Sequence, residues 1–92
     1  MNWLRALFGG KRSQFRFNPQ WKEEMVVTGP GGHFTLYFPI GVPTAILPTQ
    51  DVWPDVAPAW AIDLWPQLKA ELEQWCGENN VRFELDPEAA VY

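Results

Sequence analysis

His33 and Cys76 are the side chains in this sequence best suited to acid–base or nucleophilic chemistry, and each is the only residue of its type. A general base needs a carboxylate or a nucleophile within hydrogen-bond reach, and no sequence pattern places one beside His33. Reactive thiols favour helix N-termini or basic surroundings, whereas Cys76 lies near acids at the end of a predicted helix. We interpret His33 as an exposed strand residue and Cys76 as a small buried hydrophobe, and we expect no catalytic residue and no cofactor.

Two further motifs match ligand sites only in part. The run Gly29-Pro30-Gly31-Gly32 lacks both the Gly-Lys-Ser/Thr and the following helix of a phosphate-binding loop, so it is interpreted as a turn. Asp51, Asp55 and Asp63 do not follow the alternate ligand positions of a calcium loop. Each of them precedes a proline that would lie in the first turn of a helix, which favours helix N-caps. We therefore expect no metal site.

Charge is distributed unevenly along the 92 residues, whose net charge is −4. Residues 1–22 contain five bases and no acid, whereas residues 23–92 contain all eleven acids and two bases. An acidic body argues against a nucleic-acid partner, because phosphate contacts need Lys and Arg. A lone cysteine forms no intramolecular disulfide and fits a reducing compartment. The uncharged stretch 25–50 contains too many prolines and glycines for a simple spanning helix, so a cytoplasmic protein is predicted.

A β-hairpin is the clearest predicted element. Residues 33–40 alternate apolar and more polar side chains with the period of a strand, and the apolar positions are Phe34, Leu36, Phe38 and Ile40. Residues 22–28 form the expected partner strand, and residues 29–32 form a four-residue loop. Shorter strands are expected at 14–17, where Asn18-Pro19 ends the strand, at 45–47 and at 81–85, and the last residues are expected to be loose or docked through Val91 and Tyr92.

One main helix is expected from about Leu64 to Cys76, with Gly77 ending it. Its apolar face is formed by five residues at helical spacing: Trp65, Leu68, Leu72, Trp75 and Cys76. The order is therefore three strands, a proline-rich connection, a helix and a strand. A helix packed on one face of a small, mainly antiparallel sheet of three to five short strands predicts a single α+β domain over residues 13–92.

Residues 1–12 form a basic amphipathic head. An apolar stripe is followed directly by two bases, and the residues concerned are Trp3, Leu4, Leu7, Phe8, Lys11 and Arg12. This layout is typical of a weak interfacial anchor on anionic lipid. It suits equally a segment that docks on a partner or on the protein's own sheet, and all three alternatives stay open. The first would add a weak peripheral membrane contact to a cytoplasmic protein.

The proline-rich segment from residue 39 to residue 60 is the predicted partner-binding surface. Its prolines reduce the entropy lost on binding, and tryptophan is enriched among binding hot spots. The candidate contacts are Pro39, Pro43, Pro48, Trp53 and Trp60, with core burial as the alternative for both tryptophans. We expect a non-enzymatic protein-interaction or accessory domain. The alternatives are an acidic inhibitor or immunity-type protein that covers a basic site on a toxin or nuclease, and a small enzyme of unknown reaction.

Overall fold

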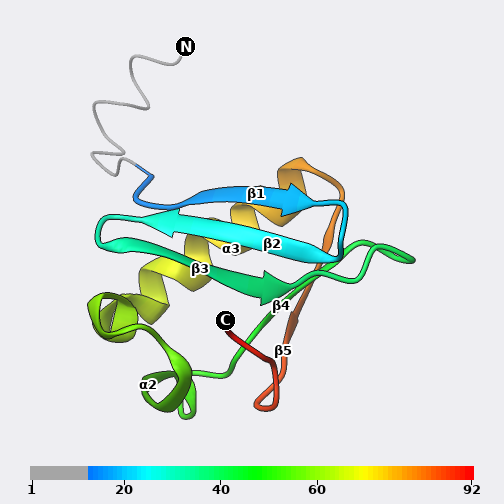
Figure 1. Cartoon of the computed structure of the whole chain (residues 1–92). Coiled ribbons are helices and arrows are strands. Elements are labelled where there is room, and N and C mark those ends of the chain that lie inside the picture. The colour runs from blue at the N-terminus through cyan, green and yellow to red at the C-terminus, as the bar shows by residue number, and fades with distance from the viewer. Residues whose placement is uncertain (1–12) are drawn as a thin grey trace, which may run out of the picture.

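The computed structural model describes residues 13–92, which form the predicted α+β fold (Figure 1). The predicted head at residues 1–12 lies outside the described residues. The elements, in chain order, are β1 (Arg16–Gln20), β2 (Glu24–Gly29), β3 (Gly32–Tyr37), β4 (Thr44–Leu47), α2 (Trp53–Val56), the 3₁₀ helix η1 (Ala59–Leu64), α3 (Trp65–Glu78) and β5 (Arg82–Leu85). The expected order of strands, helix and final strand is confirmed.

Strands β1, β2 and β3 form an antiparallel sheet in that order. The predicted hairpin is present, but its loop is shorter than expected. Gly29 pairs with Gly32, so only Pro30 and Gly31 form the turn and the predicted four-residue loop is wrong. Gly32 has a φ of +149°, a conformation that side-chain-bearing residues rarely adopt. The glycine run therefore serves a tight turn whose flanking residues belong to the strands.

Strand β1 continues through the residue that was expected to end it. Pro19 pairs with Met25 of β2, and the strand extends to Gln20. Within the described residues β1 pairs only with β2, so it is an edge strand, where the missing N–H of a proline removes no ladder hydrogen bond. The prediction that Asn18-Pro19 stops the strand was wrong because it did not take this edge position into account.

The second sheet contains two strands and is parallel. Strands β4 and β5 pair from Thr44↔Arg82 to Leu47↔Leu85. Both strands were expected individually, but their pairing with each other was not. The chain from β4 to β5 runs through α2, η1 and α3, a crossover of the length that parallel neighbours require.

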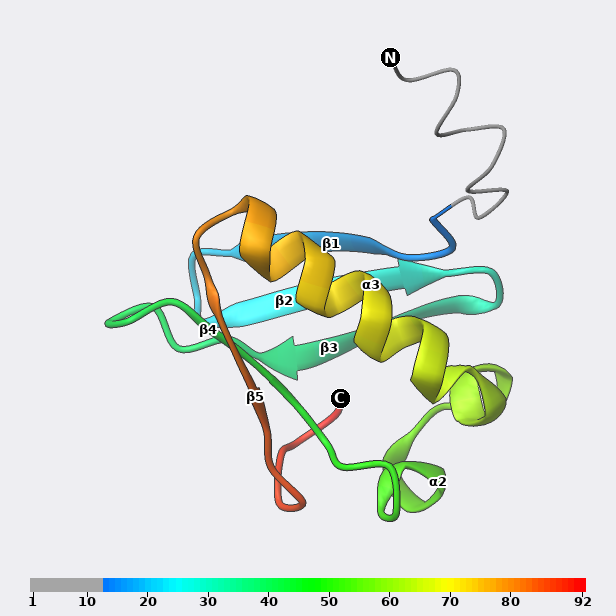
Figure 2. The ribbon, with the colours of Figure 1, turned by 180° about the vertical axis from the view of Figure 1, so that it is seen from behind.

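Helix α3 packs against one face of the three-stranded sheet and leaves the other face uncovered by any helix of the described chain (Figure 2). Four of the five predicted apolar residues, Trp65, Leu68, Leu72 and Cys76, are buried, and Trp75 is half-buried. Strands β2 and β3 alternate accordingly. Met25, Val27, Phe34 and Leu36 point to the helix and are buried, as expected for a sheet with one solvated face.

The helix ends differ from their predicted form. Val52 and Leu64 are the N-cap residues of α2 and α3, and neither helix has a side-chain cap. The predicted N-caps Asp51 and Asp63 therefore each lie one residue before the actual N-cap, and Asp55 lies inside α2, although a proline does lie in the first turn of both helices, as expected. At the other end of α3, Gly77 lies inside the helix, and the following left-handed residue is Asn80, with φ 58°.

The chain after β5 returns to the three-stranded sheet. Val91 forms a β-bridge with Leu36. Next to it, the backbone N–H groups of Tyr92 and Thr35 each donate to the other's carbonyl, at 3.0 and 3.2 Å. The last residues are therefore docked along the edge of β3, which was one of the two outcomes expected for them.

Candidate protein-docking surface

Two of the five predicted partner contacts belong to the core. Trp53 is 0% exposed, its indole N–H donates to the carbonyl of Ala61 at 2.9 Å, and its ring meets Phe34 edge-on at 5.6 Å. Pro48 is also fully buried, and its carbonyl accepts the indole N–H of Trp65 at 2.9 Å. Neither side chain can touch a partner in this fold. The alternative of core burial holds for Trp53, because the segment after β4 packs this side chain against Phe34 of the sheet and Ala61 of η1.

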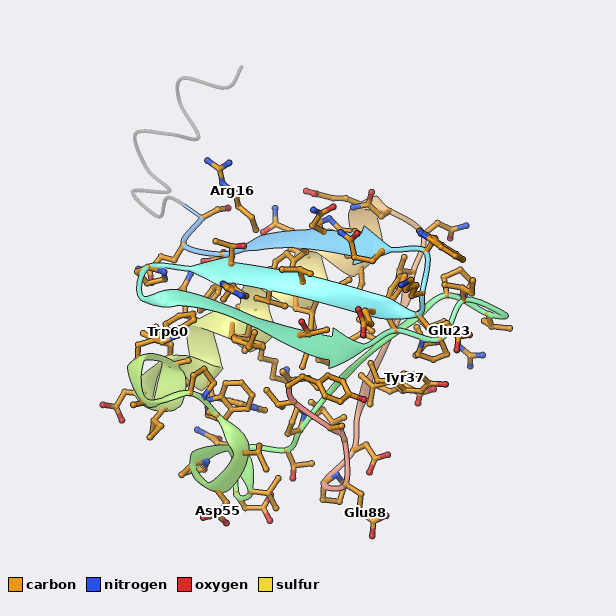
Figure 3. All side chains as sticks on the ribbon, viewed as in Figure 1. Arg16, Glu23, Tyr37, Asp55, Trp60 and Glu88 are labelled. Carbon is orange, nitrogen blue, oxygen red and sulfur yellow. The ribbon has the colours of Figure 1, made fainter. Side chains whose placement is uncertain are left out.

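Trp60 is half-buried and lies against the glycine hairpin. A Cβ atom placed on Gly31 would come within 2.5 Å of the Cβ and Cγ of Trp60. The Trp60 ring also packs on Phe15 and Phe34, with centroids 6.3 and 6.0 Å apart. These contacts hold η1 against the end of the sheet (Figure 3), so most of the Trp60 side chain stabilises the fold.

The remaining two predicted contacts lie in the loop between β3 and β4, where Pro43 is exposed and Pro39 is half-buried. Between them, Ile40 and Val42 are 47% and 57% exposed. The turn between β1 and β2 lies at the same end of the molecule (Figures 1 and 2) and carries Trp21, which is 81% exposed. We call Trp21, Ile40 and Val42 the turn-and-loop patch.

Backbone hydrogen bonds fix both segments of the turn-and-loop patch. Phe38 donates its N–H to the carbonyl of Glu23 at 3.0 Å, and Ile40 donates to a carboxylate oxygen of Glu23 at 3.4 Å. Thr44 closes the loop with an N–H bond to the carbonyl of Pro39 at 3.1 Å and a hydroxyl bond to that of Val42 at 2.6 Å. The exposed side chains therefore project from an ordered backbone, which lowers the entropy lost on contact with a partner.

A second surface feature is a groove of about 370 Å³ beside the returning chain, which we call the tyrosine groove. Its lining is mainly apolar and contains two exposed tyrosines, and the residues are Tyr37, Ile46, Asp86, Glu88, Ala89, Ala90 and Tyr92. Asp86 is fixed by a backbone bond to Leu47 at 3.0 Å, and one of its carboxylate oxygens accepts the N–H of Glu88 at 2.9 Å. The lining of the groove therefore combines apolar side chains with two carboxylates whose backbone is fixed.

The end of the molecule that bears α2 and the turn after β5 is acidic. Residues 48–56 and 85–92, which lie at this end, contain four acids and no Lys or Arg, and the longer segments 44–68 and 83–92 to which they belong contain six acids and no Lys or Arg. Asp55 and Glu88 both extend outward from it (Figure 3). Within residues 13–92 the one ion pair, between Lys69 and Glu73 at 2.9 Å, lies elsewhere, on α3. These carboxylates are available to a cationic partner.

A second groove, of about 300 Å³, lies between the start of β1 and α3. Phe17 and Trp75 form its apolar side, with ring centroids 6.1 Å apart. Glu71 accepts the backbone N–H groups of Gln14 and Phe15 at 2.9–3.0 Å and so fastens the beginning of the domain to α3. Glu71 also accepts a bond from the side-chain amide of Gln67. These polar groups already have partners and serve to position β1.

The residues considered for chemistry are separated in the structure. His33 is exposed on β3, and Cys76 is buried in α3. Burial, and secondarily the charge of Glu73, raises the pKa of the Cys76 thiol to about 11, which disfavours the nucleophilic thiolate at neutral pH. In the described part of the chain no group of three His, Cys, Asp or Glu side chains could hold a metal ion. Across residues 13–92 no helix is long and apolar enough to cross a membrane.

Trp21 was the main surface residue that the sequence reasoning missed. It follows β1, whose predicted end was Phe17, so nothing in the pattern placed Trp21 in a tight turn beside the loop 38–43. The pairing of Glu24 with Tyr37 and the hydrogen bonds of Phe38 and Ile40 to Glu23 bring these two segments together. Comparison of the chain with protein-family models, curated proteins and solved structures finds no match to any of them.

Proposed function

We propose that this protein is a non-enzymatic protein-interaction module that binds its partner through the turn-and-loop patch. The observation that carries the proposal is the exposure of Trp21. Among the tryptophans at positions 21, 53, 60, 65 and 75, it alone has a largely exposed side chain. Tryptophan is the residue type most enriched among interface hot spots, and contiguous exposed apolar side chains mark interaction sites.

The surroundings of the patch define the partner that would fit. Ile40 and Val42 add apolar area beside the Trp21 turn, while Lys22 lies 5.8 Å from the centre of the Trp21 ring. The described domain holds all eleven acids of the chain but only four of its seven bases. A partner with an apolar cleft on a basic surface would accommodate the Trp21 side chain and also experience long-range attraction.

The test compares partner binding by two double variants. Trp21→Ser with Val42→Ser removes two of the three side chains of the patch, and Val56→Ser with Ile62→Ser removes exposed apolar side chains on α2 and η1. Both should fold normally, because substitutions of exposed side chains change stability by about 0.5 kcal/mol or less. Loss of a hot-spot tryptophan weakens binding by about 2 kcal/mol or more, roughly 30-fold.

Affinity capture from native cells with the wild-type chain and both variants gives the readout. The proposal expects one protein that is retained by the wild type and by the Val56/Ile62 variant and lost from the Trp21/Val42 variant. Its affinity is then measured with purified components. Equal retention by all three chains would refute the assignment of the patch.

A second function is favoured by the acidic end: an inhibitor-like protein that covers a basic site on its target. Two segments that are distant in sequence, and that themselves contain no Lys or Arg, bring carboxylates to one end of the fold (Figure 3). A complex held by this end should weaken steeply when ionic strength rises, because exposed charges are screened within about 10 Å at 0.1 M salt. A complex held by the turn-and-loop patch should depend on salt only weakly.

A further inference from the structure

We infer that the tyrosine groove is a binding socket for an arginine side chain of a protein partner. The inference deepens the second function proposed above, since it names the group that the acidic end would recognise. Its argument rests on the pairing of the last residues with β3, on the position of Ile46 in β4, and on the carboxylates that line the groove.

The pairing of the returning chain with β3 determines where the two tyrosine rings lie. Thr35 and Tyr92 are directly opposite each other, and directly opposite residues of an antiparallel pair place their side chains on the same face. Tyr37 is two residues from Thr35 and shares that face. Tyr37 and Tyr92 are therefore diagonal neighbours, at a typical separation of about 7–8 Å. They are 42% and 70% exposed, so both side chains are accessible to a ligand.

The lining of the groove combines apolar side chains with carboxylates. Ile46 of β4, Ala89 and Ala90 are its apolar lining residues besides the two tyrosines. Asp86 and Glu88 line the same groove, and Glu84 pairs with Ile46 across the parallel ladder. The base on β5, Arg82, lies at the end of the strand opposite to Asp86. There its backbone N–H donates to the carbonyl of Pro43 at 2.9 Å.

This combination suits a guanidinium group better than other ligands. An arginine side chain has an aliphatic stem that packs on apolar surface and a planar cation that stacks on aromatic rings and bonds carboxylates. Each cation–π contact at an exposed site contributes about 0.5–1 kcal/mol, or roughly two- to fivefold in affinity. An anionic ligand would be repelled by the carboxylates, and a neutral apolar one would gain nothing from them.

The test uses an acetylated peptide, Gly-Ser-Arg-Ser-Gly amide, and the same peptide with citrulline or lysine in place of arginine. Citrulline keeps the shape of arginine and removes the charge. NMR titration of the full chain should shift the backbone amides of Ile46, Ala89, Ala90 and Tyr92 with the arginine peptide. Citrulline should bind at least fivefold more weakly, and lysine should bind about two- to fivefold more weakly, because lysine cannot stack or form a bidentate pair.

Variants separate the socket from diffuse charge attraction. Tyr92→Ala should lower arginine-peptide affinity about two- to fivefold. Glu88→Gln should lower it more than Asp55→Asn, which removes the same charge from α2 at the same end of the molecule. Equal effects of Glu88→Gln and Asp55→Asn together with no effect of Tyr92→Ala would overturn the inference, as would amide shifts scattered over the whole acidic end. If Tyr92→Ala destabilises the fold, Tyr92→Leu and the citrulline comparison give the same decision. Failure of the peptide to bind the groove would leave the salt test of the acidic inhibitor function, and the capture test of the turn-and-loop patch, unaffected.

Discussion

Gly31→Ala tests the packing of Trp60 on the hairpin turn. The added Cβ would lie 2.5 Å from two Trp60 atoms next to the backbone and 2.8 Å from a third, so no rotation of a distant side-chain end relieves the overlap. Either η1 or the turn must shift, and overpacking of this kind costs about 1–3 kcal/mol. Unlike Gly32, Gly31 has no positive φ, so its backbone accepts alanine.

The net effect is smaller than the steric term, because alanine also reduces the entropy of the unfolded chain, which stabilises by about 0.4–1 kcal/mol. We therefore expect a loss of about 1–2 kcal/mol in the free energy of unfolding, or roughly 4–16 °C in Tm for a domain of this size. Urea unfolding followed by tryptophan fluorescence measures it. Gly41→Ala is the matched control, since an added Cβ there meets nothing within 4 Å. If Gly31→Ala is as stable as Gly41→Ala, Trp60 does not pack on the turn and its assignment to the fold is wrong.

Three further predictions concern helix α3. Gly77→Ala should stabilise the protein by about 0.5–1 kcal/mol in thermal unfolding, because Gly77 lies inside the helix, where glycine is less favourable than alanine; destabilisation would show that Gly77, and not Asn80, takes the left-handed position. Glu71→Ala should lower the free energy of unfolding by about 1–2 kcal/mol, because two backbone N–H groups at the start of the domain lose their acceptor. The control Glu73→Ala breaks an exposed ion pair and should change this free energy by about 0.5 kcal/mol or less. Equal effects of the two substitutions would contradict the role of Glu71. Since burial raises the pKa of the Cys76 thiol to about 11, the unfolded thiol ionises first as pH rises, so the wild type should lose stability between about pH 9 and pH 11 relative to Cys76→Ala; parallel stability curves for the two proteins would show that the thiol is not buried.

The parts of the fold that the sequence predicted are those with a local periodic signal. The apolar face of α3 and the alternation from Phe34 to Phe38 determine which residues are buried, as predicted, whereas Ile40 lies beyond the end of β3 and is exposed. Both are consequences of the side-chain direction within one element. The element boundaries were less accurate. Pro19 was expected to end a strand and Gly77 to end a helix, but an edge strand accommodates Pro19 and α3 continues through Gly77.

The surfaces depended on long-range pairing, which leaves no periodic signal. Trp53 and Pro48 lie in a segment that resembles an exposed loop in composition, yet the turn of the chain below β4 buries both. Trp21 and Tyr92 acquire neighbours only through the pairing of β2 with β3 and of the last residues with β3. Of the predicted partner contacts, Pro39 and Pro43 therefore remain available to a partner, whereas Pro48 and Trp53 are buried.

The parallel pairing of β4 with β5 has a consequence for the order of folding. The hairpins of β1, β2 and β3 close over a few residues, whereas Thr44 meets Arg82 only after the intervening chain has condensed. Contacts distant in sequence bear a larger loop-closure entropy and form late. The tyrosine groove needs this late pairing and the docking of the last residues, while the turn-and-loop patch mainly needs the early sheet. During synthesis or partial unfolding, the chain would therefore display its apolar patch before its acidic groove, and amide hydrogen exchange should be faster at Ala89–Tyr92 than in β2.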